Sequence, residues 1–190
     1  MRYELLHVRS ALIKQSQQIS TERRGLSVVE LILSVGLILI LLSALFWAVN
    51  PPERLKQSRD TRRQSDFEGL KTAIEEALLG GEPLESTFGV PSSSVGFEVT
   101  WELDGSGWVP MVLPDWLVEL PQDPSNGKTF SDVLGSRVLG EYQFISDGKY
   151  WVLRTHLEAE TNRAKYYEDG NDNSWWEVGT APGLSTYFGL

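Results

Sequence analysis

The longest apolar stretch of the chain runs from Leu26 to Val49. Glu30 is its only ionisable residue, and neither proline nor asparagine interrupts it. About 24 residues at about 1.5 Å each would form a helix roughly 36 Å long, enough to cross a hydrocarbon core about 30 Å thick. The pattern therefore predicts a transmembrane helix over residues 26–49. A charged residue at the centre of such a helix costs roughly 2.5–3.5 kcal/mol, and less near an end, so Glu30 is a candidate functional residue.

The sequence Asn50-Pro51-Pro52 follows the apolar stretch. Proline lacks a backbone donor and restricts the residue before it, so we expect a kink or break there. Beyond it, apolar residues recur near helical spacing with charges between them, which predicts an amphipathic helix over residues 50–81 that stops at Gly80-Gly81. The apolar residues are Leu55, Phe67, Leu70, Ile74, Ala77 and Leu78.

Residues 82–190 are expected to form a globular head built on an antiparallel sheet. Strict alternation of apolar and polar residues from Val95 to Leu103 predicts a half-buried strand, and residues 108–113 are compatible with a second, returning strand. A hairpin is predicted from residues 141–146 and 150–157, since Asp147-Gly148 between them is typical of a two-residue turn. The expected fold is α+β, with a long N-terminal helix packed on a small antiparallel sheet.

Charge is distributed unevenly along the chain. Residues 1–25 contain five basic and two acidic residues, a net charge of +3, whereas residues 26–190 contain 12 basic and 24 acidic residues, a net charge of −12. Positive charge beside a first transmembrane helix keeps that side in the cytoplasm. We therefore expect residues 1–25 inside the cell and the head outside it.

A basic cluster lies in the first half of the amphipathic helix, interrupted by acidic residues. It consists of Arg54, Lys56, Arg59, Arg62 and Arg63. Such a cluster could meet lipid head groups, nucleic acid or acidic neighbours, or it could form a solvated helix face with ion pairs between subunits. The solvated face is the favoured interpretation. Nucleic acid is not expected as a partner, because the strongly acidic head would repel phosphate.

The start of the apolar stretch resembles a known signal. Arg23-Arg24-Gly25-Leu26, then a glutamate five places after the glycine, then a long apolar helix, is similar to the class III signal of type IV pilins and pseudopilins. The resemblance implies that a prepilin peptidase/methyltransferase cuts between Gly25 and Leu26 and methylates the new N-terminus at Leu26. Residues 1–25 would then be a cleaved leader, and Glu30 would be needed for assembly of a pilin-like subunit.

Glu30 also has a physical role that can be stated independently of the resemblance. Cleavage would leave a positive amine on Leu26 inside or beside the bilayer. A carboxylate on a neighbouring, staggered subunit could neutralise that amine, and the attraction would be strong in a medium of low dielectric constant. The alternative is a glutamate near a helix N-terminus that reaches the membrane interface and interacts favourably with the helix dipole.

A second resemblance covers residues 120–158, which are similar to the heads of pseudopilins related to the major subunit of type II secretion. The shared pieces are Leu-Pro, Asp-Pro-x-Asn, Tyr-x-Phe and Tyr-x-Val-Leu. Those major pseudopilins bind calcium in a C-terminal loop, and Asp169, Asn171 and Asn173 alternate as oxygen ligands do in calcium loops. The glycine and glutamate of an EF-hand are missing, and a polar turn before a final strand is the alternative to a calcium site.

The composition offers little for catalysis. The chain has no cysteine and only two histidines, His7 in the leader and His156 in an expected strand. No phosphate-binding glycine loop, Gly-x-Ser-x-Gly or His-Glu-x-x-His motif is present. We therefore expect a structural protein and not an enzyme.

Two functions remain open. The resemblance implies a structural subunit of a type IV pilus or a type II secretion-like pseudopilus, anchored by a single pass in the cell membrane and then assembled into an extracellular filament. Its partners would be copies of itself, other pilin-like subunits, the prepilin peptidase, the inner-membrane assembly platform and the lipid bilayer. The alternative is a single-pass, membrane-anchored extracellular module that binds a ligand and does not polymerise.

Overall fold

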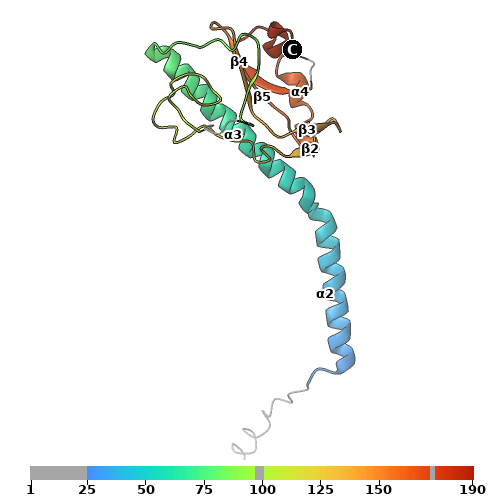
Figure 1. Ribbon diagram of the computed structural model, residues 1–190. Helices are drawn as coiled ribbons and strands as arrows, with labels where there is room; N and C mark the ends of the chain where they lie inside the picture. The colour runs from blue at the N-terminus through green and yellow to red at the C-terminus, as the bar shows by residue number, and fades with distance from the viewer. Residues whose placement is uncertain (1–24, 97–100, 172–173) are drawn as a thin grey trace, which may run out of the picture. The chain divides into compact units, whose positions relative to one another are not determined.

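The computed structural model describes residues 25–96, 101–171 and 174–190. Figure 1 shows the α+β fold, in which a long helical stretch precedes a small antiparallel sheet, as the sequence predicts. The chain divides into two compact units, Met1–Ala48 and Val49–Leu190, which are described separately below. The first unit contains nearly all of the apolar helix α2, and the second contains α3 and the strands.

Helix α2 spans Val28–Val49 and begins two residues after the predicted start at Leu26. The carbonyl oxygen of Ser27 accepts a hydrogen bond from the Leu31 amide (2.9 Å), which starts the helical ladder. Glu30 lies in the first turn, three residues after Ser27, and this is the spacing of a Ser-x-x-Glu capping box. A carboxylate at this position also interacts favourably with the partial positive charge of the helix N-terminus.

Asn50 interrupts the helical stretch where a break is predicted. Its backbone has φ 46° and ψ 67°, in the left-handed region, and helix α3 then spans Pro51–Gly80. Proline is tolerated in the first helical turn because the amides there have no partner within the helix. Gly81, with φ 93°, ends α3 by donating its amide to the Leu78 carbonyl (3.1 Å).

The head contains a four-stranded antiparallel sheet in the order β1-β4-β5-β6. Its strands are β1 Ser92–Ser93, β4 Gln143–Ser146, β5 Trp151–Thr155 and β6 Trp176–Gly179. A separate antiparallel pair is formed by β2 Thr129–Ser131 and β3 Arg137–Leu139. Short helical segments follow β5 and β6; these are η1 Glu160–Asn162, α4 Lys165–Glu168 and η2 Leu184–Phe188.

The predicted hairpin is confirmed by β4 and β5, but its turn is longer than expected. Ser146 pairs with Trp151, so four residues connect the strands instead of two. The Asp147 carboxylate accepts hydrogen bonds from the Lys149 amide (2.8 Å) and the Tyr150 amide (2.7 Å). Asp147 therefore closes the wider loop through its side chain, as Asp commonly does in turns.

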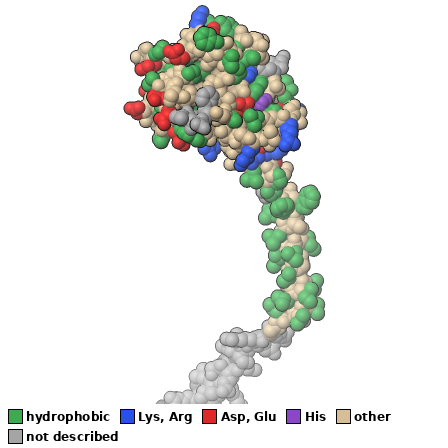
Figure 2. Space-filling model, viewed as in Figure 1, with side chains coloured by type: hydrophobic (Ala, Val, Ile, Leu, Met, Phe, Trp, Pro, Cys, Tyr) green, Lys and Arg blue, Asp and Glu red, His purple; other side chains and the backbone are tan. Residues whose placement is uncertain are grey.

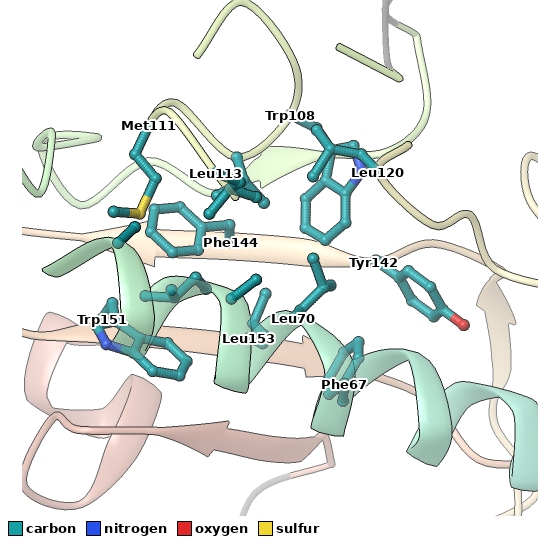
Figure 3. Packing of buried hydrophobic residues seen from close by; sticks show 14 residues of the cluster. Phe67, Leu70, Trp108, Met111, Leu113, Leu120, Tyr142, Phe144, Trp151 and Leu153 are labelled. Atoms are coloured by element: carbon teal, nitrogen blue, oxygen red, sulfur yellow. The ribbon is translucent and has the colours of Figure 1, made fainter. Parts of the chain in front are cut away.

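One face of α3 supplies the centre of the hydrophobic core. Its buried apolar residues recur at helical spacing and are Phe67, Leu70, Ala73, Ile74 and Ala77. They form one cluster with residues of the sheet and of the loop after residue 101, including Phe144, Leu153, Trp108, Met111 and Leu113. Figure 3 shows Phe67 and Leu70 of α3 among these residues. The predicted apolar face is thus confirmed from Phe67 onward, whereas Leu55 is 61% exposed.

The prediction of a strand from Val95 to Leu103 is wrong where it can be compared. Val95, Gly96 and residues 101–103 are not in a strand, and residues 97–100 lie outside the described residues. Residues 108–113 do not form a returning strand either, apart from one antiparallel bridge between Asp104 and Val112. This segment has irregular backbone, and most of its apolar side chains are buried in the core with α3. These are Trp108, Val109, Met111 and Leu113, whereas Val112 is 47% exposed.

Candidate functional site

The predicted processing site lies at the start of the described residues. Gly25 and Leu26 precede α2 and are not helical. Nothing lies within 4 Å of the position that a Cβ on Gly25 would occupy, and Leu26 is exposed. Within the described part of the chain, no residue covers the peptide bond at which cleavage is expected. The remainder of the predicted leader, residues 1–24, lies outside the described residues.

Apolar side chains surround α2 on all sides. From Val28 to Trp47 its leucine, isoleucine and valine side chains are exposed, and none of its side chains in this range is buried. By length and composition, the helix can cross a membrane. A helix that is apolar all round requires lipid or other apolar helices around it. Glu30 is the one ionisable residue on this surface, and its carboxylate has no hydrogen-bond partner among the described residues.

A second group of charges is buried in the head, between α3, the loop before β2 and the segment after β5. Arg63 is fully buried at its centre. Its Nε and Nη2 atoms donate to Asp123 Oδ2 (2.7 Å) and Oδ1 (2.9 Å), and its Nη1 donates to Asp60 Oδ1 (2.8 Å). Nη2 also lies 2.8 Å from Glu158 Oε1. Burial alone would lower the Arg63 pKa, but the hydrogen bond and charge of Asp123, together with Glu158, outweigh burial and raise it.

Arg59 and Asp60 extend this buried ion network to the backbone after β5. Arg59 Nε donates to Glu158 Oε1 (2.9 Å), and Arg59 Nη2 also contacts Glu158. The Asp60 carboxylate accepts hydrogen bonds from the Glu158 amide (2.9 Å) and the Ala159 amide (2.8 Å). Burial raises the pKa of Glu158, but the hydrogen bond from Arg59 and the charge of Arg63 outweigh burial and lower it. The network therefore attaches α3 to the polar segment that follows the sheet.

This geometry corrects the interpretation of the basic cluster as a solvated helix face. Arg63 is buried, and Arg59 pairs with a carboxylate of the same chain. Arg54, Lys56 and Arg62 keep the surface position that was expected of all five. Asp60 is three residues from Arg63, but Asp123 lies 60 residues from Arg63 and Glu158 lies 99 residues from Arg59, so the spacing of the cluster carries no information about these two carboxylates. One signal was present, because Arg63 precedes Phe67 by four residues and so shares its helix face.

The three predicted calcium ligands belong to the C-terminal loop. Asp169 and Asn171 are among the described residues, and Asn173 is not. Asp169 accepts a hydrogen bond from the Glu177 amide (3.0 Å), and the Asn171 side chain donates to Glu177 Oε2 (2.7 Å). Burial raises the pKa of Asp169 to about 6. Among the described residues, no group of three or more His, Asp or Glu side chains is placed to hold a metal ion. Calcium binding therefore stays a prediction, and Glu177 is a buried carboxylate that the spacing did not reveal.

Comparison of the chain with protein-family models, with curated proteins and with solved structures gave no match. The structure and the residues themselves are therefore the basis for any statement about function. The features that bear on it most directly are the exposed segment around Gly25, the carboxylate of Glu30 on an apolar helix, and the compact head with its buried ion network.

Proposed function

We propose that this protein is a structural subunit of a type IV pilus or of a type II secretion-like pseudopilus. Glu30 carries the proposal, because it is the only ionisable residue of a helix whose other side chains are suited to lipid or to neighbouring apolar helices. It stands five residues after Gly25, at which a prepilin peptidase would cut. Among the described residues none lies over the backbone before α2, which supports access of such an enzyme to the Gly25–Leu26 bond.

In the proposed assembly, the head remains outside the cell and the α2 helices of several copies pack side by side. Removal of residues 1–25 leaves a positively charged amine, or methylamine, on Leu26. The Glu30 carboxylate of a neighbouring copy neutralises this charge within the apolar bundle, where an unpaired charge would be expensive. The protein is then a substrate of the peptidase and a building block of the filament.

The competing explanation for Glu30 is local, because it stands three residues after Ser27, at the spacing of the glutamate in a Ser-x-x-Glu capping box. Glutamine serves equally well at that position of the motif, but it carries no charge. Glu30→Gln therefore separates the two roles: a capping residue tolerates the change, whereas a residue that neutralises an amine does not. Ser34→Ala is the matched control, since Ser34 lies one turn later on the same helix and its hydroxyl bonds only the Glu30 carbonyl (2.7 Å) among the described contacts.

The experiment is performed on the full chain in cells that contain a prepilin peptidase and an assembly platform. Intact mass and N-terminal sequencing of the membrane-extracted protein measure processing, and electron microscopy with immunoblotting of sheared material measures filaments. We expect a chain that begins at Leu26, abundant filaments for the wild type and Ser34→Ala, and no filaments for Glu30→Ala and Glu30→Gln.

Two results would contradict the proposal. Normal filaments from Glu30→Gln would restrict Glu30 to helix capping. A wild-type chain that still begins at Met1 and is displayed without filaments would favour the membrane-anchored binding module.

A further inference from the structure

One end of the head carries a hollowed surface with an apolar floor and an acidic rim. Two adjoining hollows of about 340 and 290 Å³ share Val112, Leu113 and Asp115 in their lining. Their floor and margin expose apolar side chains, with Val112 47% exposed and Val118 91% exposed. We call this surface the acidic hollow. It lies between the C-terminal part of α3 and the irregular segment that follows residue 101.

The rim of the acidic hollow is lined by carboxylates, and the stretch of sequence that supplies them contains no basic residue. Glu76, Glu82, Glu102, Asp104 and Asp115 all contribute to the lining. Between Lys71 and Lys128 the chain contains no lysine or arginine. Exposed apolar surface inside a ring of carboxylates favours a partner that presents an apolar side chain flanked by cations.

The N-terminal part of α3 presents that combination. Leu55 is exposed and stands between the surface cations Arg54 and Lys56, with Arg62 two turns later. We call these four residues the basic end of α3. Figure 2 shows an uneven distribution of charge on the visible face of the head, with most lysine and arginine side chains along its lower edge, others at its top, and most aspartate and glutamate side chains on its left side.

The two surfaces cannot meet within one molecule. They lie on the same helix, and the 21 residues from Leu55 to Glu76 place them about 30 Å apart along its axis. A contact between them therefore requires two copies. Because the two surfaces differ, the first copy would keep its basic end free and the second its acidic hollow. Such a head-to-tail contact continues into an open helical array unless it closes into a ring.

We propose that the acidic hollow binds the basic end of α3 of a second copy of this chain. In this contact Leu55 lies over Val112 and Val118, and the flanking cations face the carboxylates of the rim. The contact would link heads along the filament, so in this respect it rests on the proposed function. It differs from the Glu30 contact in position, because both of its surfaces belong to the unit 49–190.

Cysteine cross-linking tests the contact directly, because the chain has no cysteine of its own. Full-length chains with Leu55→Cys and one affinity tag are produced together with full-length chains that carry Val112→Cys and a second tag. After oxidation of intact membranes, we expect disulfide-linked dimers that contain both tags. Chains with either cysteine alone should give none. Lys149→Cys replaces Val112→Cys in the matched control, since Lys149 is exposed in the β4–β5 turn and does not line the acidic hollow.

Charge exchange then tests the chemistry of the contact. Adding Arg54→Glu and Lys56→Glu to the Leu55→Cys chain should reduce the mixed dimer about tenfold, because like charges then face each other. Adding Glu82→Lys and Asp115→Lys to the Val112→Cys chain should restore it. A mixed dimer that is lost and regained in this way supports the proposal, and a yield that does not respond to the charges overturns it.

The same membranes are examined for filaments, so that failure of the contact and failure of the proposed function can be told apart. Filaments without a mixed dimer would overturn the contact and leave the filament function. A mixed dimer without filaments would support the contact and overturn the function. Absence of both would overturn both, and a dimer formed by Val112→Cys chains alone would show that the hollow packs on itself, which also overturns the proposal.

Discussion

Replacement of Arg63 by alanine should destabilise the head strongly, although its position in a charged run of α3 suggests a surface residue. Arg63 is fully buried, and its guanidinium donates to Asp123 and Asp60 and lies against Glu158. Removing one partner of a buried ion pair typically costs about 3–5 kcal/mol, because a charge remains buried without compensation. The effect should therefore be a large part of a total stability that is about 5–15 kcal/mol for most domains.

The structure shows where this loss arises. Glu158 keeps its contacts with Arg59 after the substitution, and Asp60 keeps the backbone amides of Glu158 and Ala159. Asp123 loses two short hydrogen bonds and keeps the Ser125 amide (2.7 Å) and the Thr155 hydroxyl (3.4 Å), so it is left without a cationic partner. We therefore expect a loss of about 4 kcal/mol, of which Asp123→Asn in the Arg63→Ala background should recover about 1–2 kcal/mol by removing the unpaired charge.

The assay is urea unfolding of the full chain in a mild detergent, followed by fluorescence of the buried tryptophans Trp108 and Trp151. With a denaturant dependence of about 2 kcal/mol per molar urea, a loss of about 4 kcal/mol lowers the midpoint by about 2 M. Arg62→Ala is the control, since Arg62 is exposed and should change stability by at most about 0.5 kcal/mol. A loss of stability below 1 kcal/mol for Arg63→Ala would refute the reasoning. It would also be refuted if Asp123→Asn restored no stability to the Arg63→Ala chain.

Three further predictions concern other parts of the head. Burial lowers the pKa of His156 to about 4, so between about pH 6.5 and 4 the unfolded chain binds a proton that the folded chain does not. The free energy of unfolding should therefore fall by up to about 3 kcal/mol over this range. His156→Gln should remove this part of the pH dependence when unfolding is measured as a function of pH. Gly179→Ala should destabilise β6 by several kcal/mol in thermal unfolding, because a Cβ there would lie 2.2 Å from the Trp151 carbonyl oxygen. Tyr142→Phe should cost about 1 kcal/mol in urea unfolding, since the buried hydroxyl donates to Asp66 (2.7 Å), and an unchanged midpoint would show that this bond contributes nothing.

Local signals in the sequence were sufficient for the two long helices and for one hairpin. The apolar run predicts α2 to within two residues of its start, and Asn50-Pro51-Pro52 marks the break before α3. The glycine pair that ends α3 and the hairpin of β4 and β5 were also predicted. In each case the deciding interaction lies within a few residues, through helical hydrogen bonds, proline geometry or a turn.

The sequence was misleading where the partner of a segment is distant. Alternation from Val95 to Leu103 satisfies the pattern of a strand, but a strand also needs an edge with which to pair, and most of the described part of this segment has none. Apolar side chains of the neighbouring loop, such as Trp108, are part of the core although their backbone is irregular. Hydrophobic periodicity indicates which side chains become buried, whereas hydrogen-bond pairing depends on what lies beside them.

By itself the sequence determined that this protein has an apolar helix with one carboxylate, a following amphipathic helix and an acidic head with an antiparallel hairpin. Only the tertiary structure decided which charges are buried together and which remain on the surface. Arg63 and Arg62 are adjacent and chemically identical, yet one is enclosed by carboxylates from distant segments and the other is exposed. The physical reason is that burial of a charge depends on a compensating partner, and folding alone brings Asp123 and Glu158 to α3.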